Sequence, residues 1–144
     1  MKIRDLLRTK GNEVITIASD RSIADAVQLL VQHRIGVLVV VDDGEIRGVL
    51  SERDVLRIAA SDPALLTRDH VADHMTTKLI VGVGDDDIEY VMEILTKNRI
   101  RHLPIVEDGH LTGLISIGDV VNALRTGLES ENRYLRDYVH GIIA

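Results

Sequence analysis

Hydrophobic residues along the chain follow two periods, that of a helix face and that of a buried strand. Between Ile23 and Val31 the apolar residues recur three and four positions apart, which is the spacing of one helix face. From Val37 to Val41 the residues are apolar without a break, and such a run indicates a strand buried on both faces. The stretches Val14–Ile17 and Ile46–Leu50 are also short and aliphatic, so they predict two more strands.

The same order returns later in the chain. One stretch has apolar residues at helical spacing, and three aliphatic runs surround it: the helix face at Ile88, Val91, Met92 and Leu95, and the strands Leu79–Val83, Leu103–Val106 and Leu111–Ile115. Each copy then ends in a further helical stretch. The predicted order is therefore strand, helix, strand, strand, helix, written twice.

The two patterns are copies of one sequence. The stretch RIGVLVVVDDGEIRGVLSERDVL begins at Arg34 and returns as RIRHLPIVEDGHLTGLISIGDVV at Arg99, an offset of 65 residues. Without a gap, this offset aligns residues 14–56 with 79–121 and gives 14 identities in 43 positions. The stretches before the copies, Ile3–Leu7 and Val71–Met75, correspond loosely after a shift of three residues. A match of this length predicts one supersecondary unit used twice.

Polar residues mark where the predicted elements turn or begin. Asp-Gly at 43–44 and 108–109 favours a tight hairpin turn in each copy. Side chains that can bond the unpaired amides of a helix start stand before each predicted helix, and three of those helices also carry Asp at their third position. The predicted N-caps are Ser22, Ser51, Ser116 and either Asp86 or Asp87, and the third-position residues are Asp25, Asp54 and Asp119.

These elements predict an α/β fold of two tandem repeats related by a pseudo-twofold axis. One copy alone leaves a face of its sheet uncovered, so we expect the two sheets to pack together over a shared core. The expected units are residues 1–66, the first repeat with its N-terminal lead-in, residues 67–126, the second repeat, and residues 127–144, a helical tail. Within these, we expect one helical turn in the linker Ala60–His74 and a last helix over Glu129–His140.

Composition narrows the classes of function. The chain has no Cys, Phe or Trp, three Tyr and a formal net charge of −6. Base stacking needs aromatic side chains and phosphate backbones need a basic face, so nucleic-acid binding is not expected. The absence of cysteine excludes disulfides and thiolate metal sites and fits a reducing compartment. Charges interrupt the first residues, and no apolar run approaches about 18 residues, so we expect a cytoplasmic protein without a secretion signal or a membrane span.

The most informative polar residues are the two Ser-x-x-Asp motifs, Ser51–Asp54 and Ser116–Asp119. They have two interpretations. In the first, the hydroxyl and the carboxylate only cap a helix. In the second, the helix start offers amides and partial positive charge to an anion, while the carboxylate accepts hydrogen bonds from a ribose diol. Spacing alone does not separate the two.

The wider sequence around these motifs resembles tandem CBS domains, named after cystathionine beta-synthase. The pattern Gly-aliphatic-aliphatic-Ser-x-x-Asp follows an Asp-Gly turn twice, in GVLSERDVLR and in GLISIGDVV, and VADHMT at 71–76 resembles the usual lead-in to a copy. The resemblance implies a regulatory pair, or Bateman module, that binds AMP, ADP, ATP, NAD or S-adenosylmethionine between its repeats and senses energy or metabolites. It also implies a homodimer and a regulated partner protein. The alternative is an interaction or scaffold module with no physiological small ligand.

The resemblance also implies where a nucleotide would lie. Asp54 and Asp119 would hold ribose hydroxyls, and Ser51 and Ser116 would lie beside ribose or phosphate. The backbone expected to border adenine comes from two segments in each copy: Thr16, Ile17, Ala18, Gly36, Val37 and Leu38 in the first, and Val81, Gly82, Val83, Arg101, His102, Leu103 and Pro104 in the second.

The two expected clefts differ in charge. Arg101 and His102 resemble the basic pair that meets phosphate in several CBS proteins, whereas the first copy has an uncharged pair there and carries Arg53 before Asp54 instead. We therefore expect both clefts to bind, with different preferences for the number of phosphates. His102 equally fits an ordinary histidine at the edge of the core.

Other motifs fit a catalytic or metal site poorly. Gly82-Val83-Gly84 lacks the third glycine of a dinucleotide-binding loop, and the acidic run 85–87 would repel phosphate there. His70 and His74 have the spacing of helical zinc ligands but no nearby third ligand, so a polar linker is expected. There is no Gly-x-Ser-x-Gly nucleophile motif. We expect no enzymatic activity, no catalytic cofactor and no metal.

Overall fold

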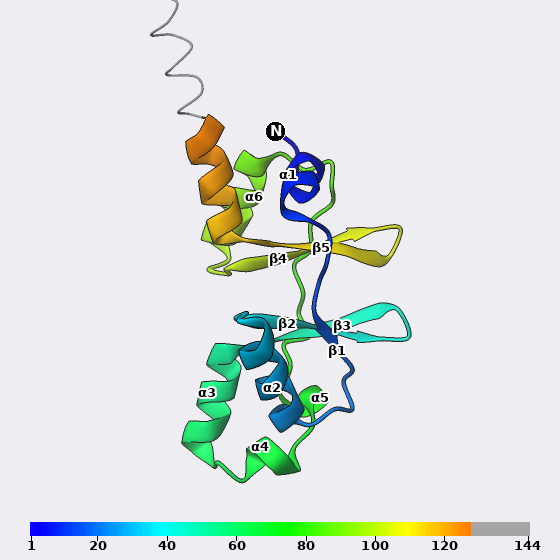
Figure 1. Ribbon diagram of the computed structural model, residues 1–144, viewed down its shortest axis with the longest axis vertical. Coiled ribbons are helices and arrows are strands. Elements are labelled where there is room, and N and C mark those ends of the chain that lie inside the picture. The colour runs from blue at the N-terminus through cyan, green and yellow to red at the C-terminus, as the bar shows by residue number, and fades with distance from the viewer. Residues whose placement is uncertain (128–144) are drawn as a thin grey trace, which may run out of the picture.

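Two small sheets face each other at the centre of the protein, and helices cover the outer side of each sheet (Figure 1). The structure is a computed structural model and describes residues 1–127. It confirms the α/β class and the two repeats. The last helix expected from the sequence, Glu129–His140, lies outside the described residues.

The helices and strands follow the order predicted for each copy. The chain begins with α1 (Ile3–Lys10). The first repeat contains β1 (Thr16–Ile17), α2 (Ile23–His33), β2 (Val37–Asp42), β3 (Glu45–Ser51) and α3 (Glu52–Ser61), followed by the short helices α4 (Leu65–Arg68) and α5 (Val71–His74). The second repeat contains α6 (Ile88–Lys97), β4 (His102–Glu107), β5 (His110–Ser116) and a helix over residues 117–127.

The first strand of each repeat is shorter than predicted. In the first sheet β1 keeps two residues and pairs parallel to β2, which pairs antiparallel to β3. In the second sheet β4 and β5 form the antiparallel pair, and the predicted strand Leu79–Val83 is reduced to one parallel bridge between Gly82 and Ile105. Glycine weakens a strand because it has no side chain to pack. A Cβ at Gly82 would lie 2.8 Å from Leu103, so this glycine permits close packing on the second sheet.

The backbone of the two hairpins repeats as closely as the sequence does. Asp43 and Asp108 both have φ of 50°, and the glycines after them have φ of 81° and 80°. Positive φ at both central residues defines the tight turn that joins twisted antiparallel strands, as the Asp-Gly pairs predict. Each hairpin also has a register shift at the same place along the strands.

The segments before the two repeats are exchanged between them. Ile3, Leu6 and Leu7 of α1 are buried in the hydrophobic cluster of the second repeat, although α1 precedes the first. Val71 of α5 is buried in the cluster of the first repeat. Equivalent backbone hydrogen bonds hold both segments: Ile3 N donates to Asp86 O over 2.9 Å, and Val71 N donates to Arg21 O over 2.8 Å.

We therefore define two halves by packing. The first half is residues 15–75, and the second half is residues 1–10 with 79–127. The unit boundaries expected from the sequence, at 66 and 126, follow chain order and remain a prediction. The loosely matching lead-ins at 3–7 and 71–75 now have equivalent places in opposite halves.

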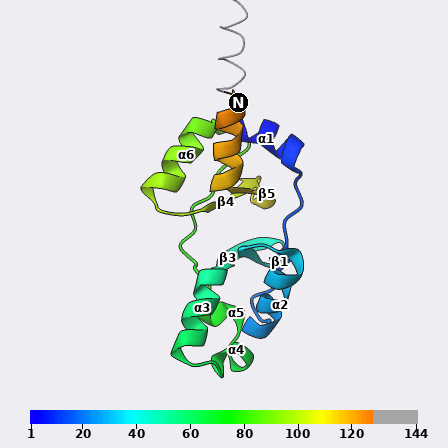
Figure 2. The ribbon, with the colours of Figure 1, turned by 60° about the vertical axis from the view of Figure 1, so that its left-hand side comes forward.

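The hydrophobic core is divided between the halves rather than shared. Along β2 the side chains alternate, so that Leu38 and Val40 belong to the cluster under the helices of the first half, while the buried Val37 and Val39 lie on the strand face turned toward the other sheet. The second half has its own cluster around α1, α6, β4 and β5. β3 and β5 lie in contact across the boundary (Figure 2).

The linker contains more helix than expected. α3 continues to Ser61, and α4 and α5 follow where one helical turn was predicted. The Asp62 side chain accepts a hydrogen bond from Ala64 N at 3.0 Å and so shapes the entry to α4. Across residues 1–127, no helix combines the length and the apolar character that a bilayer crossing would require.

Candidate ligand clefts

The Ser51–Asp54 motif forms a complete capping box at the start of α3. Ser51 N donates to Asp54 Oδ2 at 2.8 Å, and Asp54 N donates to Ser51 Oγ at 3.2 Å. The Ser51 hydroxyl also donates to Asp54 Oδ2 at 3.0 Å. Both side chains therefore satisfy amides that a helix start leaves unpaired.

Ser116 and Asp119 repeat this arrangement before the helix over residues 117–127. Ser116 N donates to Asp119 Oδ2 at 2.9 Å, and Asp119 N donates to Ser116 Oγ at 3.1 Å. A third residue joins them from α1. Lys10 Nζ lies 2.5 Å from Asp119 Oδ2 and 2.6 Å from Leu114 O, a contact that the sequence did not predict.

Several influences act on the charge of Asp119. Partial burial raises the pKa of this carboxyl, but hydrogen bonds from Lys10 and Ser116, with the Lys10 charge, outweigh burial and hold the pKa below its ordinary value of 3.8. Asp119 is therefore a carboxylate at neutral pH and acts as an acceptor of hydrogen bonds.

Capping occupies only one oxygen of each carboxylate. The cap bonds of Asp54 and Asp119 all end on Oδ2. Within residues 1–127, Asp54 Oδ1 meets only Arg57, at 3.4 Å, and Asp119 Oδ1 accepts no hydrogen bond. A carboxylate offers about four acceptor positions on two oxygens. The capping role and a ligand role are therefore compatible in the same carboxylate.

The loops predicted to border adenine lie next to these helix starts. Glu52 N donates to Gly36 O at 2.9 Å, and the equivalent Ile117 N donates to Arg101 O at 2.8 Å. Register places Val37 opposite Ser51 and His102 opposite Ser116. One end of each sheet thus brings together the loop, the serine and the aspartate.

The remaining predicted residues either bury their side chains or lie toward the hairpin end of each sheet. The side chains of Ile17, Leu38 and Leu103 are buried in the two cores, so only their backbone can face a ligand. Because β1 runs parallel to β2, Ala18 lies toward the hairpin end of the sheet, away from the Ser51 end. The equivalent Val83 also lies toward that end, and its amide bonds Asp86 Oδ2 at 2.9 Å.

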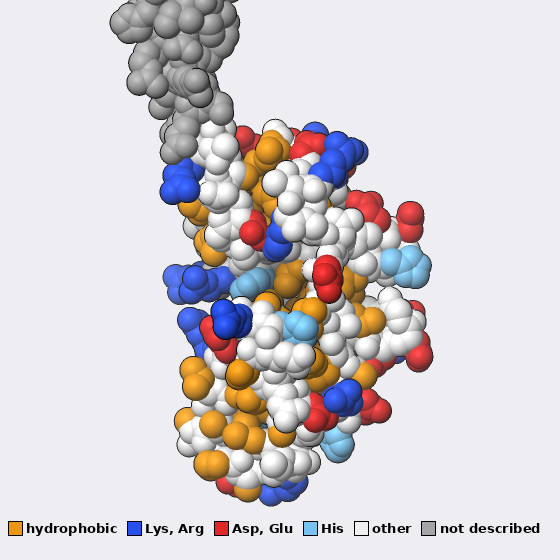
Figure 3. Space-filling model, viewed as in Figure 1, with side chains coloured by type: hydrophobic (Ala, Val, Ile, Leu, Met, Phe, Trp, Pro, Cys, Tyr) orange, Lys and Arg blue, Asp and Glu red, His pale blue; other side chains and the backbone are white. Residues whose placement is uncertain are grey.

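Basic side chains approach both helix starts. Arg53 and Arg101 are exposed, and His102 is partly buried between the halves. Burial lowers the pKa of His102 below its ordinary value of 6.5, and the nearby charges of Lys10 and Arg101 lower it further. Lys, Arg and His side chains gather along one edge of the boundary between the halves (Figure 3).

Each aspartate lines a hollow, but most of the other residues that line these hollows were not predicted from the sequence. A cavity of about 1000 Å³ lies beside Asp119, and one of about 240 Å³ lies beside Asp54. The larger cavity is lined by α1, the start of α6 and the last described helix, including Leu6, Thr9, Lys10, Ile88, Asn122 and Ala123. The smaller one is lined by Arg57, Ile58, Ser61 and His74. The hollows reach the carboxylates from the helix side rather than from the strands.

The sequence contained a weak signal for Lys10. The lead-in match at an offset of 68 pairs Lys10 with Lys78, but it does not reveal that the lead-ins exchange halves. Without that exchange Lys10 has no reason to meet Asp119, which is 109 positions away.

His74, which the sequence offered as a possible zinc ligand with His70, has a structural partner instead. Its Nε2 lies 2.7 Å from Asp69 Oδ2, and this hydrogen bond lowers the pKa of Asp69.

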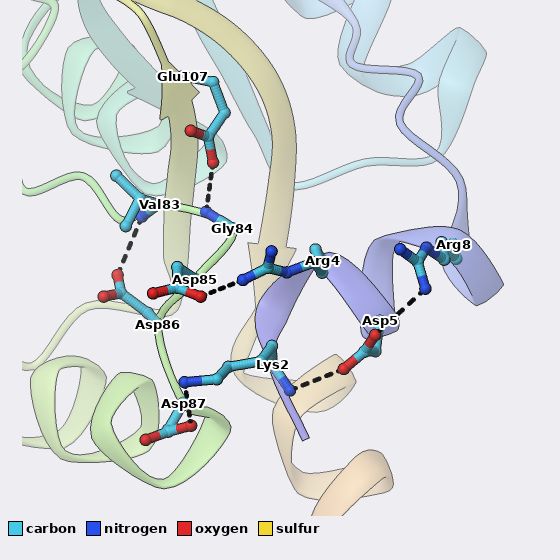
Figure 4. A network of polar contacts seen from close by, with 10 residues as sticks. All are labelled: Lys2, Arg4, Asp5, Arg8, Val83, Gly84, Asp85, Asp86, Asp87 and Glu107. Carbon is cyan, nitrogen blue, oxygen red and sulfur yellow. Dashed lines mark hydrogen bonds and ion pairs between the residues drawn. The ribbon is translucent and has the colours of Figure 1, made fainter.

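The acidic run 85–87 has structural partners (Figure 4). Asp85 pairs with Arg4, and Asp87 Oδ1 lies 3.0 Å from Lys2 Nζ. Asp87 holds the N-cap position of α6, although its side chain makes no cap hydrogen bond. Among the residues that the structure describes, no three His, Cys, Asp or Glu side chains come together as metal ligands would. These ion pairs link the acidic run to the N-terminal residues and so hold α1 against the second half.

Comparison with known proteins places this geometry in a family. The model of the CBS domain matches the chain twice, at residues 3–61 and 71–126. The chain belongs to the CBS-domain family. Both Ser-x-x-Asp motifs fall within the matched residues, and each match begins at one of the exchanged lead-ins.

Similar CBS proteins come from plants and bacteria. The chain is 34% identical to the CBS domain-containing protein CBSX3, mitochondrial, of Arabidopsis thaliana, over 96% of this chain and 72% of that protein. The crystal structure of a CBS-domain containing protein from Agrobacterium tumefaciens superposes with a TM-score of 0.81 at 40% identity and covers 85% of this chain and 98% of its own. The crystal structure of CBSX2 in complex with AMP gives a TM-score of 0.73 at 28% identity, over 87% of this chain and 96% of its own.

CBS pairs also occur inside enzymes. Inosine-5'-monophosphate dehydrogenase of Thermoplasma acidophilum is 34% identical to this chain over 76% of its length, but the match covers 21% of the enzyme. The similarity is therefore confined to a small part of that enzyme.

Proposed function

We propose that this CBS pair is a non-catalytic regulatory module that binds adenosine-containing ligands, one beside Asp54 and one beside Asp119. The observation that supports it most directly is the duplicated carboxylate: in each half Oδ2 accepts the cap hydrogen bonds, Oδ1 accepts none of them, and the aspartate lines a hollow. A ribose diol donates two hydrogen bonds and suits such an acceptor. The AMP complex of CBSX2, a similar pair, supports the same ligand class.

The loops and basic residues give the proposal its detail. Backbone at Gly36 and Arg101 adjoins the helix starts, where adenine would be bordered. Arg101 and His102 would meet phosphate in the second cleft and Arg53 in the first, so the clefts would prefer different numbers of phosphates. AMP, ADP, ATP and NAD all contain the required adenosine.

Binding would act by population shift. A ligand that contacts both halves favours one arrangement of the module or of its dimer over another, and a partner protein would read that difference. The ligand must bind the two arrangements with different affinity, because otherwise it shifts nothing.

We also propose a homodimer formed through helix faces. Val31 of α2 and Leu56 of α3 are 73% and 70% exposed, and Val121, the equivalent of Leu56, is 46% exposed. Aliphatic side chains at equivalent places in both halves suit a twofold contact. Light scattering after size-exclusion chromatography should give twice the chain mass for the wild type and a smaller mass for Leu56→Glu.

The cytoplasmic location expected from the sequence remains a prediction.

A thermal-shift panel tests the ligand proposal. AMP, ADP, ATP and NAD are added to the full chain, with guanosine monophosphate as the control for phosphate and ribose without adenine. A ligand at 100 times its Kd stabilises the folded state by about 2.7 kcal/mol, which is a measurable rise in Tm. A flat response to all adenine nucleotides would favour the alternative, a scaffold without a small ligand.

Calorimetry then locates the sites. Asp54→Ala and Asp119→Ala should each remove one binding event and leave the other. Because alanine also removes a capping acceptor, Asp54→Asn and Asp119→Asn are made as well, which keep an acceptor oxygen for the cap. Loss of all binding in each single variant would contradict two independent clefts and indicate one composite site.

A further inference from the structure

We propose that Lys10 of α1 sets the specificity of the second cleft, by holding Asp119 until a ligand that carries phosphate takes its ammonium group. This inference rests on the proposed function, because it names a residue that selects among adenosine ligands. It concerns the second half only. The lead-in helix thereby becomes part of a site formed mainly by the second repeat.

The contact is well defined. Lys10 Nζ lies 2.5 Å from Asp119 Oδ2 and 2.6 Å from Leu114 O, so the ammonium has two acceptors on the second half. The side chains of Lys10 and Asp119 are 36% and 27% exposed. Both residues line the cavity of about 1000 Å³, so a ligand that entered this hollow would meet the pair.

The pair competes with a ribose. Asp119 Oδ2 already accepts from Ser116 N and from Lys10, which fills the usual capacity of one carboxylate oxygen. A diol that bonds both oxygens of the carboxylate must therefore displace Lys10, since the Ser116 amide is fixed at the helix start. A displaced ammonium loses a charge-assisted hydrogen bond unless the ligand supplies another anion.

A phosphate supplies that anion. It would leave the ribose on Asp119 and give Lys10 a new partner near His102, on which the charges of both Lys10 and Arg101 act. Adenosine has no anion to offer. A nucleoside that displaces Lys10 therefore loses the free energy of the Lys10–Asp119 hydrogen bond, whereas a nucleotide replaces that hydrogen bond with one to its phosphate.

The first half is arranged differently, because no lead-in residue reaches its aspartate. Asp54 Oδ2 accepts two hydrogen bonds from Ser51, and its other oxygen lies 3.4 Å from the exposed Arg57 of the same helix. Lys78, the sequence counterpart of Lys10, is exposed and makes no salt bridge to a residue that the structure describes. Lys78→Met therefore removes the same charge from the chain without touching the proposed contact.

The test measures AMP and adenosine binding by calorimetry in the full chain carrying Asp54→Ala, which leaves the second cleft. Three further variants are compared in this background: Lys10→Met, Lys10→Arg and Lys78→Met. In Lys10→Met, adenosine should bind more tightly and the preference for AMP over adenosine should fall about tenfold, the size expected for one charge-assisted hydrogen bond. Lys10→Arg and Lys78→Met should keep the preference.

Each other result has a distinct meaning. If neither the wild type nor any variant binds AMP, the proposed function fails and this inference fails with it. If the wild type binds but Asp54→Ala does not, the second cleft does not bind by itself, and both that part of the proposed function and the role of Lys10 are overturned. If Asp54→Ala binds but Lys10→Met keeps the full preference, only the role of Lys10 is overturned. An equal fall in Lys78→Met would assign the preference to net charge and would also overturn the proposal.

Discussion

The carbonyl oxygens of Val49 and Leu114 occupy equivalent places in the two halves but accept different donors. Val49 O accepts a hydrogen bond from the backbone N of Thr76 at 2.9 Å. Leu114 O accepts from the side chain of Lys10 at 2.6 Å. In the first half the lead-in has become extended at this point, whereas in the second half it is still helical, and the position is filled by an ammonium group.

The cause lies in where each lead-in helix ends. α5 stops at His74, and β-branched Thr76, a poor helix former, stands where α1 has Arg8, a good one. α1 continues to Lys10 and ends at Gly11, although its Thr9 matches Thr77. A difference of one helical turn therefore brings the ammonium group of a lead-in beside Asp119, whereas Asp54 meets only Arg57 of its own helix. Duplicated sites can diverge without any change in the repeat itself.

The largest expected effect tests the exchange of lead-ins. Ile3 has no exposed surface and belongs to the core of the second half, so Ile3→Ala should lower the free energy of unfolding by about 2–5 kcal/mol. Hydrogen exchange should become faster in α6, β4 and β5 rather than in β1 and α2, the elements next along the chain. Urea unfolding gives the size of the effect, and residue-resolved hydrogen exchange gives its place.

Val71→Ala is the matched variant in the other half. Val71 is fully buried against the first core, so its truncation should cost about 2 kcal/mol and loosen α2, β2 and β3. If both variants loosened the same set of amides, the two cores would behave as one, and the division into halves would be contradicted.

The next comparison is between two equivalent glycines under the lead-ins, whose expected costs differ by about 2 kcal/mol. A Cβ at Gly48 would lie 2.6 Å from the backbone oxygen of Thr76, whereas a Cβ at Gly113 would meet the terminal methyl groups of Leu7, at 2.7 Å. A leucine side chain can turn away, but a paired backbone segment must move as a whole. Gly48→Ala should therefore cost about 3 kcal/mol and Gly113→Ala about 1 kcal/mol, within the range for overpacking. Equal losses in thermal unfolding would contradict this difference in lead-in contact.

The sequence predicted the repeat more fully than it predicted the site. The 65-residue offset, the Asp-Gly turns and the caps at Ser51 and Ser116 are local, and local patterns fix local structure. The exchange of α1 and α5 was not predictable, because the two lead-ins resemble each other in sequence and chain order does not say in which half each one packs. The contact of Lys10 with Asp119 depends on that exchange. The strand predicted over Leu79–Val83 is reduced to one bridge at Gly82, where the backbone packs closely on the second sheet. This close packing is visible only in the folded chain.

His102 provides a further comparison, because its counterpart in the first half is Val37. Burial and the charges of Lys10 and Arg101 lower the pKa of His102 below 6.5. A depressed pKa contributes stability that is present above pH 6.5 and lost as the pH falls through the folded pKa. A bound phosphate would offset the neighbouring positive charges, so AMP should raise the pKa of His102, while adenosine should leave it low.

NMR titration of the imidazole signals measures this change. His33, at the exposed end of α2, serves as the control, whose signals AMP should not shift. His102→Val places in the second half the residue that the first half has at this position. In this variant the affinity for AMP should no longer depend on the protonation of residue 102 and should be closer to the affinity of the first cleft. An unchanged His102 titration at saturating AMP would contradict phosphate contact at this position.

The smallest expected effect concerns acid stability and isolates the pair that distinguishes the halves. Burial raises the pKa of Asp119, but the hydrogen bonds from Lys10 and Ser116 bring it below 3.8, so the stability that this carboxylate contributes is present above about pH 4 and is lost as the pH falls through its folded value. Lys10→Met should move the pKa of Asp119 upward and shift the loss of stability to higher pH, and Lys78→Met should do neither. Carbon-detected titration of the carboxyl groups measures the pKa directly. If Asp119 titrated alike in both variants, Lys10 would not hold the carboxylate in solution, and the difference between the two clefts would have to come from their other basic residues, Arg53, Arg101 and His102.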